Sequence, residues 1–143
     1  MSEYLHPTLL APCEAETPCV YQLRIYEVDP AKRQAFHDRF ENHALRIMKC
    51  YDFEVIALWE STSLIDFEFV YILRWPDLGT MQRQWDLFMA DEEWIGIKKA
   101  MAGRIGEPVR RVSSSVLDVV GYSPSIGGRA QQALRADNRP RAR

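Results

Sequence analysis

The side chain best suited to catalysis is His43, because it lies within an apolar helical stripe. Phe36, Phe40, His43 and Ile47 fall at positions i, i+4, i+7 and i+11 of one expected helix. A stripe of this kind faces a core, so we expect His43 to point at a sheet. A neutral imidazole there could act as a general base or orient a ligand. The alternative is a buried histidine satisfied by one hydrogen bond.

A second candidate group combines two basic side chains with a phenol: Arg24, Tyr26 and Arg74. Arg24 and Tyr26 alternate onto one face of the expected first strand, and Arg74 ends the third. We expect these strands to be neighbours, with both guanidinium groups on the side that faces a second copy of the chain. Such a pair could bind a carboxylate or an enolate. The alternative is pairing with carboxylates of the same chain, for which the candidates are Glu27, Glu54, Glu60 and Glu68.

Large aromatic side chains could line an apolar pocket. The candidates are Trp59, Tyr71, Trp75 and Trp85, although their spacing also suits a plain core. A small-molecule site is mostly apolar with a few placed polar groups. We therefore expect a ligand to bind between the first helix and the sheet, or in the adjoining space between two copies. The residues to test there are His43, Arg24, Tyr26, Trp59, Tyr71 and Arg74.

The sequence contains none of several motifs that are typical of particular enzyme classes. It contains no Gly-rich phosphate loop, no GxSxG and no dinucleotide-binding fingerprint. The three histidines have no metal-ligand spacing, and the three cysteines form no CxxC pair. We therefore expect no metal site and no resident cofactor. A Cys13–Cys19 disulfide is possible, but a reducing cytosol argues against it.

Hydrophobic periodicity predicts how these side chains are positioned. Strands are expected at 20–28, 53–60, 67–75 and 109–120, and helices at 30–50, 77–89 and 91–103. Asp29 and Pro30 are typical of a helix start. The resulting order, strand–helix–strand–strand–helix–strand, predicts an α+β fold. This is the ferredoxin-like βαββαβ arrangement with a four-stranded antiparallel sheet.

The third strand is apolar on both faces, which has a consequence for assembly. One face carries Phe69, Tyr71, Leu73 and Trp75, and the other carries Val70 and Ile72. A strand with one wet face would alternate apolar and polar residues. Two helices can cover only one side of a four-stranded sheet, so we expect a second copy of the chain to cover the other. The sequence therefore predicts a homodimer in which two sheets form a dimeric α/β barrel.

Composition sets the remaining bounds. The 143 residues are 47% hydrophobic and 27% charged, which is ordinary for one globular domain. No apolar run is long enough to span a bilayer, and the first residues do not form a secretory signal. We therefore expect a cytoplasmic protein without a membrane partner.

Two terminal segments lie outside the expected domain at 19–124. Residues 1–18 contain Pro7, Pro12 and Pro18, which predicts an irregular lead-in. Residues 125–143 are basic and poor in large apolar side chains, which is typical of a disordered tail. Nucleic-acid binding by that tail is not expected, because no aromatic residue after Tyr122 could stack on a base.

These stretches also resemble a known family, the NIPSNAP domain. Tyr21-Gln-Leu-Arg-Ile-Tyr26, then a helix with Phe36, Phe40 and His43, and then Trp59 are similar to its beginning. The stretch from Phe69 through Arg74-Trp-Pro-Asp77, with Trp85, Asp91 and Trp94, is similar to its middle, and Tyr122-Ser-Pro124 to its end. The resemblance implies a dimeric α/β barrel and a histidine of interest at position 43. It implies little about chemistry, because the family includes scaffolding or signalling proteins and bacterial members of undefined activity.

Three functions are consistent with these patterns. The first is a NIPSNAP-like barrel that serves as a binding module for a small molecule or a protein, with undefined activity. The second is a small cofactor-independent enzyme of biosynthesis, of monooxygenase, isomerase or cyclase type, acting on a hydrophobic or aromatic substrate. The wider superfamily that the resemblance implies contains such enzymes. The third is a haem-binding protein with His43 as the ligand.

Overall fold

The computed structural model describes residues 19–62 and 67–126, so the predictions for the lead-in and most of the tail lie outside the described residues. The strands are β1 (Val20–Val28), β2 (Glu54–Thr62), β3 (Phe67–Trp75) and β4 (Val109–Asp118). The first helical region comprises η1 (Pro30–Lys32), α2 (Arg33–Arg39), η2 (Phe40–Ala44) and α3 (Leu45–Cys50). The second comprises α4 (Leu78–Met89) and α5 (Glu92–Ile105). The expected βαββαβ order is confirmed, although β4 ends two residues earlier than predicted.

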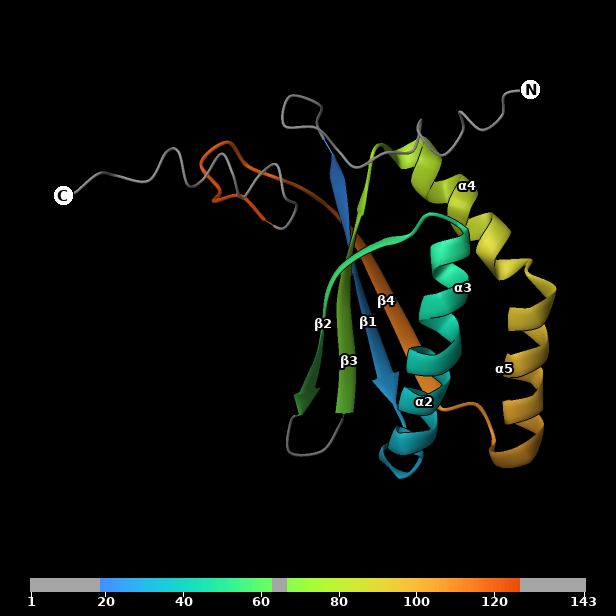
Figure 1. The fold of residues 1–143 in the computed structure, drawn as a ribbon. Coiled ribbons are helices and arrows are strands. Elements are labelled where there is room, and N and C mark those ends of the chain that lie inside the picture. The colour runs from blue at the N-terminus through green and yellow to red at the C-terminus, as the bar shows by residue number, and fades with distance from the viewer. Residues whose placement is uncertain (1–18, 63–66, 127–143) are drawn as a thin grey trace, which may run out of the picture.

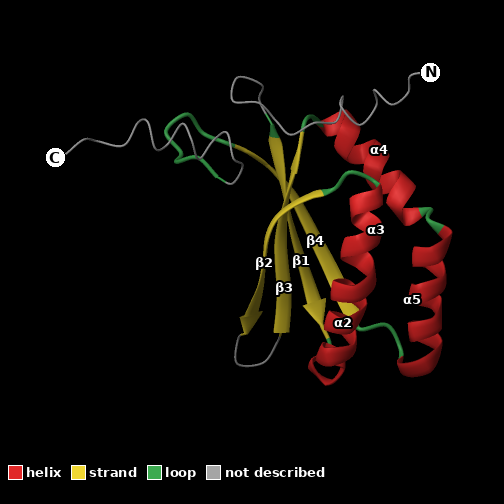
Figure 2. Ribbon diagram, viewed as in Figure 1, coloured by secondary structure: helices red, strands yellow, loops and turns green. Residues whose placement is uncertain are grey.

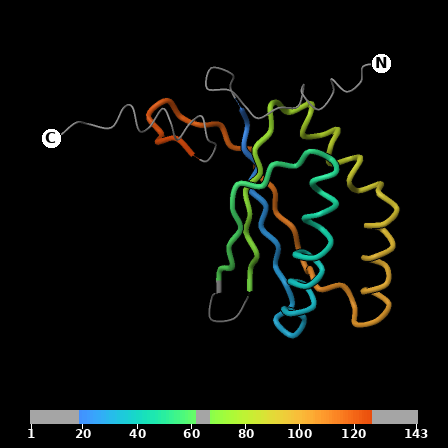
Figure 3. Tube along the Cα trace, viewed as in Figure 1, coloured from blue at the N-terminus to red at the C-terminus, as the bar shows by residue number. Residues whose placement is uncertain are grey.

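The four strands form one antiparallel sheet in the order β2-β3-β1-β4, which is the ferredoxin-like arrangement. All four labelled helices lie on one side of this sheet (Figure 1), and Figure 2 shows the resulting two layers. In Figure 3, β4 returns alongside β1 at the end of the chain. Among the described residues, no helix packs on the second face of the sheet, which we call the open face. This is the face that the sequence analysis expects a second copy of the chain to cover.

Aspartates begin the helices, as the sequence predicts. Their carboxylates accept hydrogen bonds from main-chain N–H groups of Ala31, Thr80 and Trp94, at 3.0, 2.7 and 2.8 Å. These caps, Asp29, Asp77 and Asp91, satisfy donors that the first helical turn leaves unpaired. Each helix therefore starts at a position fixed by local sequence.

The first helical region contains a π turn at η2, and this changes which residues face the sheet. A π turn closes a wider ring of main-chain hydrogen bonds than an α turn, so the inward position moves by one residue. The buried stripe is Phe36, Phe40, Ala44, Ile47 and Met48. His43 lies beside this stripe and is only half-buried. The prediction that His43 points at the sheet is therefore wrong.

Two groups of aromatic rings fill the space between the sheet and the helices. The first aromatic cluster consists of Tyr26, Phe36, Phe40, Phe69 and Tyr71. The second aromatic cluster consists of Phe53, Trp75, Trp85, Phe88 and Trp94. Most of their ring pairs are edge-to-face or tilted, as aromatic side chains prefer. Between them, the two clusters define the core and the walls of the site described below.

The structure also bears on the expectations for the cysteines and for membrane-spanning helices. Cys19 is disulfide-bonded, so the alternative that the sequence analysis disfavoured, a cysteine in a disulfide, is the one found at this position. Cys50 is an exposed free thiol. Within 19–62 and 67–126, none of the helices has the length and apolar character needed to cross a membrane.

Candidate functional site

The polar face of β1 is the face that the helices cover. Gln22, Arg24 and Tyr26 face the helices, and cross-strand pairing sets Arg24 opposite Tyr71 on this side. The apolar residues Leu23 and Ile25 face the other way, onto the open face. This is the reverse of an ordinary surface strand, in which the apolar face is covered. The arrangement brings polar groups into the interior, where they could bind a ligand.

Arg24 lies among aromatic rings. Its guanidinium carbon is 4.2 Å from the ring centroid of Trp85 and 5.4 Å from that of Tyr26. One Nη donates to the Tyr26 hydroxyl at 3.4 Å, whereas the buried Nε has no hydrogen-bond partner. Burial opposes the charged form, but the hydroxyls of Tyr26 and Tyr71 outweigh it and raise the pKa of Arg24. Arg24 therefore remains positively charged, and its Nε–H group donates no hydrogen bond.

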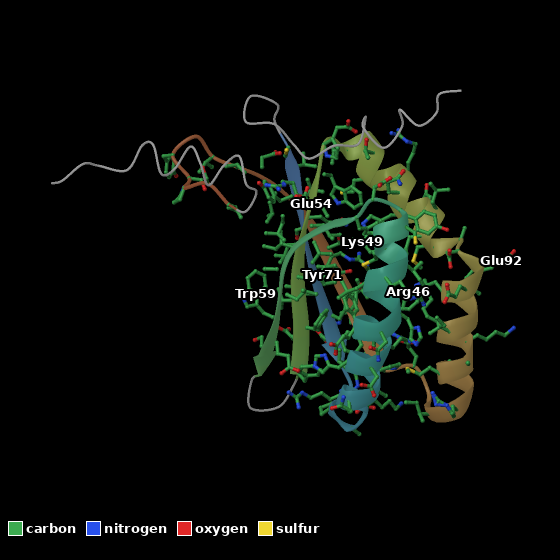
Figure 4. The ribbon with its side chains drawn as sticks, viewed as in Figure 1. Arg46, Lys49, Glu54, Trp59, Tyr71 and Glu92 are labelled. Carbon is green, nitrogen blue, oxygen red and sulfur yellow. The ribbon has the colours of Figure 1, made fainter. Side chains whose placement is uncertain are left out.

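Two tyrosine hydroxyls meet beside this guanidinium. The Tyr26 and Tyr71 oxygens are 2.6 Å apart, and either can donate to the other. Burial raises the pKa of Tyr71 well above its ordinary value, and the nearby Tyr26 raises it further. Tyr71 consequently remains a neutral phenol at physiological pH, and its hydroxyl keeps a proton with which it can donate a hydrogen bond. Figure 4 shows it on the helix side of the sheet.

A cavity of about 390 Å³ adjoins these groups. It lies between the two aromatic clusters, and its lining includes Arg24, Tyr26, Phe40, Trp85 and Trp94. This volume falls within the roughly 300–1,000 Å³ typical of small-molecule sites. An apolar pocket of about 430 Å³ lies on the open face, the other location expected from sequence. Unlike that pocket, the cavity between the helices and the sheet is lined by several cationic side chains. We call it the helix-side cavity.

The far wall of the helix-side cavity carries further charged groups. Arg39 is only 5% exposed and forms a bidentate pair with Glu107, at 3.2 and 3.1 Å. Lys98 lies 5.6 Å from the ring centroid of Trp94. Burial and the Arg39 charge lower the pKa of Lys98. The cavity therefore contains three cationic side chains and one carboxylate.

Gln22 positions the tryptophan that stacks on Arg24. Its side-chain oxygen accepts from the indole nitrogens of Trp75 and Trp85, at 2.9 and 2.7 Å. Its side-chain nitrogen donates to Ser114 on β4 at 3.0 Å. Sequence reasoning gave Gln22 no role, although strand alternation sets it on the same face of β1 as Arg24 and Tyr26. It also missed Arg39, for which the available signal is a basic residue next to the buried stripe of the first helical region.

Arg74 does not belong to this site. It faces the open face, opposite in direction to Arg24, because the two residues have opposite parity along paired strands. Its Nε donates to Glu54 at 3.1 Å, and one Nη forms a short bond to the same carboxylate. The expectation that both guanidinium groups share one side is wrong. The alternative, pairing of Arg74 with a carboxylate of the chain, is confirmed for Glu54.

The remaining sequence candidates also lie outside the helix-side cavity. His43 Nδ1 is 3.2 Å from Arg46, on the side of the first helical region that faces α5. Trp59 is half exposed on the open face (Figure 4). Of the six residues expected at the site, the structure thus brings together Arg24, Tyr26 and Tyr71.

The buried phenol gives a pH-dependent prediction. An unfolded tyrosine has a pKa of about 10, and in the folded protein that of Tyr71 is higher. Below pH 10 both states are protonated, and above it the unfolded chain loses the proton first. We expect the free energy of unfolding to fall above pH 10, and Tyr71→Phe to reduce this fall. Urea unfolding of both proteins from pH 8 to 11 measures the effect, and identical profiles would contradict it.

These features define a class of protein: a two-layer ferredoxin-like α+β domain with an aromatic, positively charged cavity on the helix side. The sequence model of the family described as NIPSNAP matches residues 21–124. The chain belongs to the NIPSNAP family. A search among curated proteins finds no match.

Solved structures with the same fold include other NIPSNAP proteins. One is a NIPSNAP family protein of unknown function from Agrobacterium tumefaciens, with a TM-score of 0.64 and 18% identity over 79% of this chain and 98% of that one. An uncharacterized NIPSNAP-like domain protein from Burkholderia xenovorans has a TM-score of 0.62 and 19% identity over 76% and 91% of the two chains. A monooxygenase of Streptomyces coelicolor, in complex with nanaomycin D, has a TM-score of 0.50 and 12% identity over 76% and 93%. These likenesses describe the fold.

Proposed function

We propose that this protein is a homodimeric barrel protein that binds an apolar small molecule in the helix-side cavity. The observation that carries the proposal is the cavity itself, a half-open space of about 390 Å³ lined by residues of both aromatic clusters and by Arg24, whose buried Nε has no partner. A core built only for stability would close such a space, because unfilled volume beside aromatic side chains costs packing energy. Polar donors without partners are similarly costly unless something else satisfies them.

The open face supports the homodimer. Leu23, Ile25, Val70 and Ile72 lie side by side on its two central strands. Internal ion pairs flank them, Arg111 with Glu27 towards one end and Arg74 with Glu54 towards the other. An apolar centre with a polar rim is typical of a protein interface. A second copy is the occupant we propose, because an isologous pair buries the same patch on both subunits at once.

An enzymatic role is the second candidate, and the Tyr26–Tyr71 pair favours it. A neutral phenol beside a fixed guanidinium could donate a proton to a developing oxyanion in the cavity. This is chemistry that needs no cofactor, in keeping with a monooxygenase, isomerase or cyclase type of enzyme. The fold-level neighbour from Streptomyces coelicolor is a monooxygenase. His43 takes no part in either proposal, because it lies outside the cavity.

A cavity-blocking variant tests the binding proposal. Val112 lines the helix-side cavity and is half exposed on β4, so Val112→Trp can place an indole in the opening without disturbing the core. We expect titration calorimetry with 2-naphthamide, a neutral bicyclic aromatic probe, to show binding to the natural protein and at least about tenfold weaker binding to the variant.

Val116 supplies the matched control. It is a half-exposed valine on the same strand and the same face, but it does not line the cavity. Val116→Trp should therefore bind the probe like the natural protein. Equal affinities for all three proteins would place binding elsewhere, and no binding of 2-naphthamide or 2-naphthoate to the natural protein would refute the proposed function.

A further inference from the structure

We propose that the ligand of the helix-side cavity carries a carboxylate, which binds at the guanidinium group of Arg24. This inference rests on the proposed function and names the chemical class of its ligand. The pocket on the open face is almost entirely apolar, and near His43 the Arg46 guanidinium is paired with Glu93. The helix-side cavity instead combines apolar walls with a guanidinium that has no anionic partner among the described residues.

The first observation is that Arg24 has no anionic partner. Among the described residues, the groups that act on its charge are tyrosine hydroxyls, not carboxylates. The other buried or half-buried arginines differ: Arg39 pairs with Glu107 and Arg74 with Glu54. A buried guanidinium without a counter-ion carries a large desolvation cost. A bound carboxylate would remove that cost by supplying the missing charge.

The second observation is geometric. Trp85 stacks on the guanidinium at 4.2 Å, and the hydrogen bond that its indole donates to Gln22 holds that indole in place. The planar group is thereby held in one orientation, and the Arg24 side chain lines the cavity. The Tyr26 hydroxyl lies within 3.4 Å of one Nη. A carboxylate can accept from a guanidinium edge and from a nearby hydroxyl together.

The third observation is the charge of the whole cavity. Arg24, Arg39 and Lys98 line it, and Glu107 is the one carboxylate among the lining residues. Glu107 is already committed, because it accepts from Arg39 and from the Val109 main-chain nitrogen. Burial opposes its ionisation, but Arg39 and that nitrogen lower the pKa of Glu107 nonetheless. An excess of positive charge therefore remains and favours an anion.

The rest of the cavity sets the shape of the ligand. Its other walls are Phe36, Phe40, Met48, Phe88 and Trp94 together with two valines of β4. Such walls favour rings or alkyl chains and carry few hydrogen-bonding groups. The structure thus points to an apolar acid with one charged end rather than to a sugar, a nucleotide or a polyanion.

Matched pairs of probes test this directly. Benzoate, 2-naphthoate and octanoate are compared with their primary amides by titration calorimetry at pH 7.5 with the full chain. Each pair has nearly the same size and shape and differs in charge. We expect the carboxylate of the best-fitting pair to bind at least about tenfold more tightly than its amide, a difference of about 1.4 kcal/mol.

Variants of Arg24 assign the effect to one side chain. Arg24→Met keeps much of the volume and removes the charge, so it should abolish the preference for carboxylate while leaving amide affinity within about threefold. Binding of the amide also shows that the variant is folded. Arg24→Lys, which keeps the charge, should retain part of the preference. Lys98→Met should change it less than Arg24→Met, because Lys98 lies at the opposite wall of the cavity.

The outcomes separate the two proposals. Binding of amides and carboxylates with equal affinity would overturn the carboxylate inference and leave the binding function standing. A carboxylate preference that survives Arg24→Met would overturn the assignment to Arg24. If no member of any pair binds the natural protein, the binding function and the inference both fail.

Discussion

Replacing Ile72 with glutamate should convert the proposed homodimer into monomers. Ile72 lies at the centre of the open face, on β3, opposite Leu23 on β1 and Ala57 on β2. A carboxylate buried in an apolar interface costs several kcal/mol without a partner. An isologous interface contains each substitution twice, so we expect the dissociation constant to rise by at least about a hundredfold.

Sedimentation at micromolar concentration measures this change. The natural protein should sediment at twice the chain mass of 16.6 kDa, and the variant at the chain mass. Leu87→Glu is the control, because Leu87 is a half-exposed apolar side chain on α4, in the helix layer. It should leave the dimer unchanged. A natural protein that is a well-folded monomer would contradict the proposed barrel.

The second large effect is expected at Phe69, where Phe69→Ala should lower the free energy of unfolding by about 3–5 kcal/mol. Phe69 is 5% exposed and lies at the centre of the first aromatic cluster. Its ring centroid is 4.7 Å from that of Phe40 and 4.9 Å from that of Phe36. Truncation removes these contacts and leaves a cavity that the sheet cannot close.

Denaturant unfolding measures the loss, with both proteins at one concentration because dimer stability depends on concentration. Leu78→Ala is the control, since Leu78 is 53% exposed at the start of α4. It should cost less than about 0.5 kcal/mol. A loss below about 1 kcal/mol for Phe69→Ala would mean that the first aromatic cluster does not hold the helices to the sheet.

The order of elements could be predicted from sequence because its signals are local. Capping aspartates fixed the helix starts, and the two apolar faces of β3 identified a central strand. The π turn could not be predicted in this way, because the hydrophobic pattern was read with one constant repeat of 3.6 residues per turn along the whole helical region. For that reason a constant helical repeat predicted the wrong orientation for His43.

The site could be predicted only in part. Strand alternation correctly placed Arg24 and Tyr26 together, but alternation alone does not say which face the helices cover. Here they cover the more polar face of β1, so Arg24 faces the helices whereas Arg74 faces the open face. Contacts between distant segments, such as Gln22 with Trp85 and Arg39 with Glu107, carry no local signal. They required the folded structure.

The tryptophans offer the most direct test of ligand binding in the helix-side cavity. The chain contains four of them; Trp85 and Trp94 line that cavity, whereas Trp59 lines the groove on the open face. Indole N–H resonances are followed by heteronuclear NMR as 2-naphthoate is added to the full chain. We expect the Trp85 and Trp94 resonances to shift together while Trp59 stays in place. A shift of Trp59 with Trp85 and Trp94 unchanged would contradict the assignment of the helix-side cavity as the binding site.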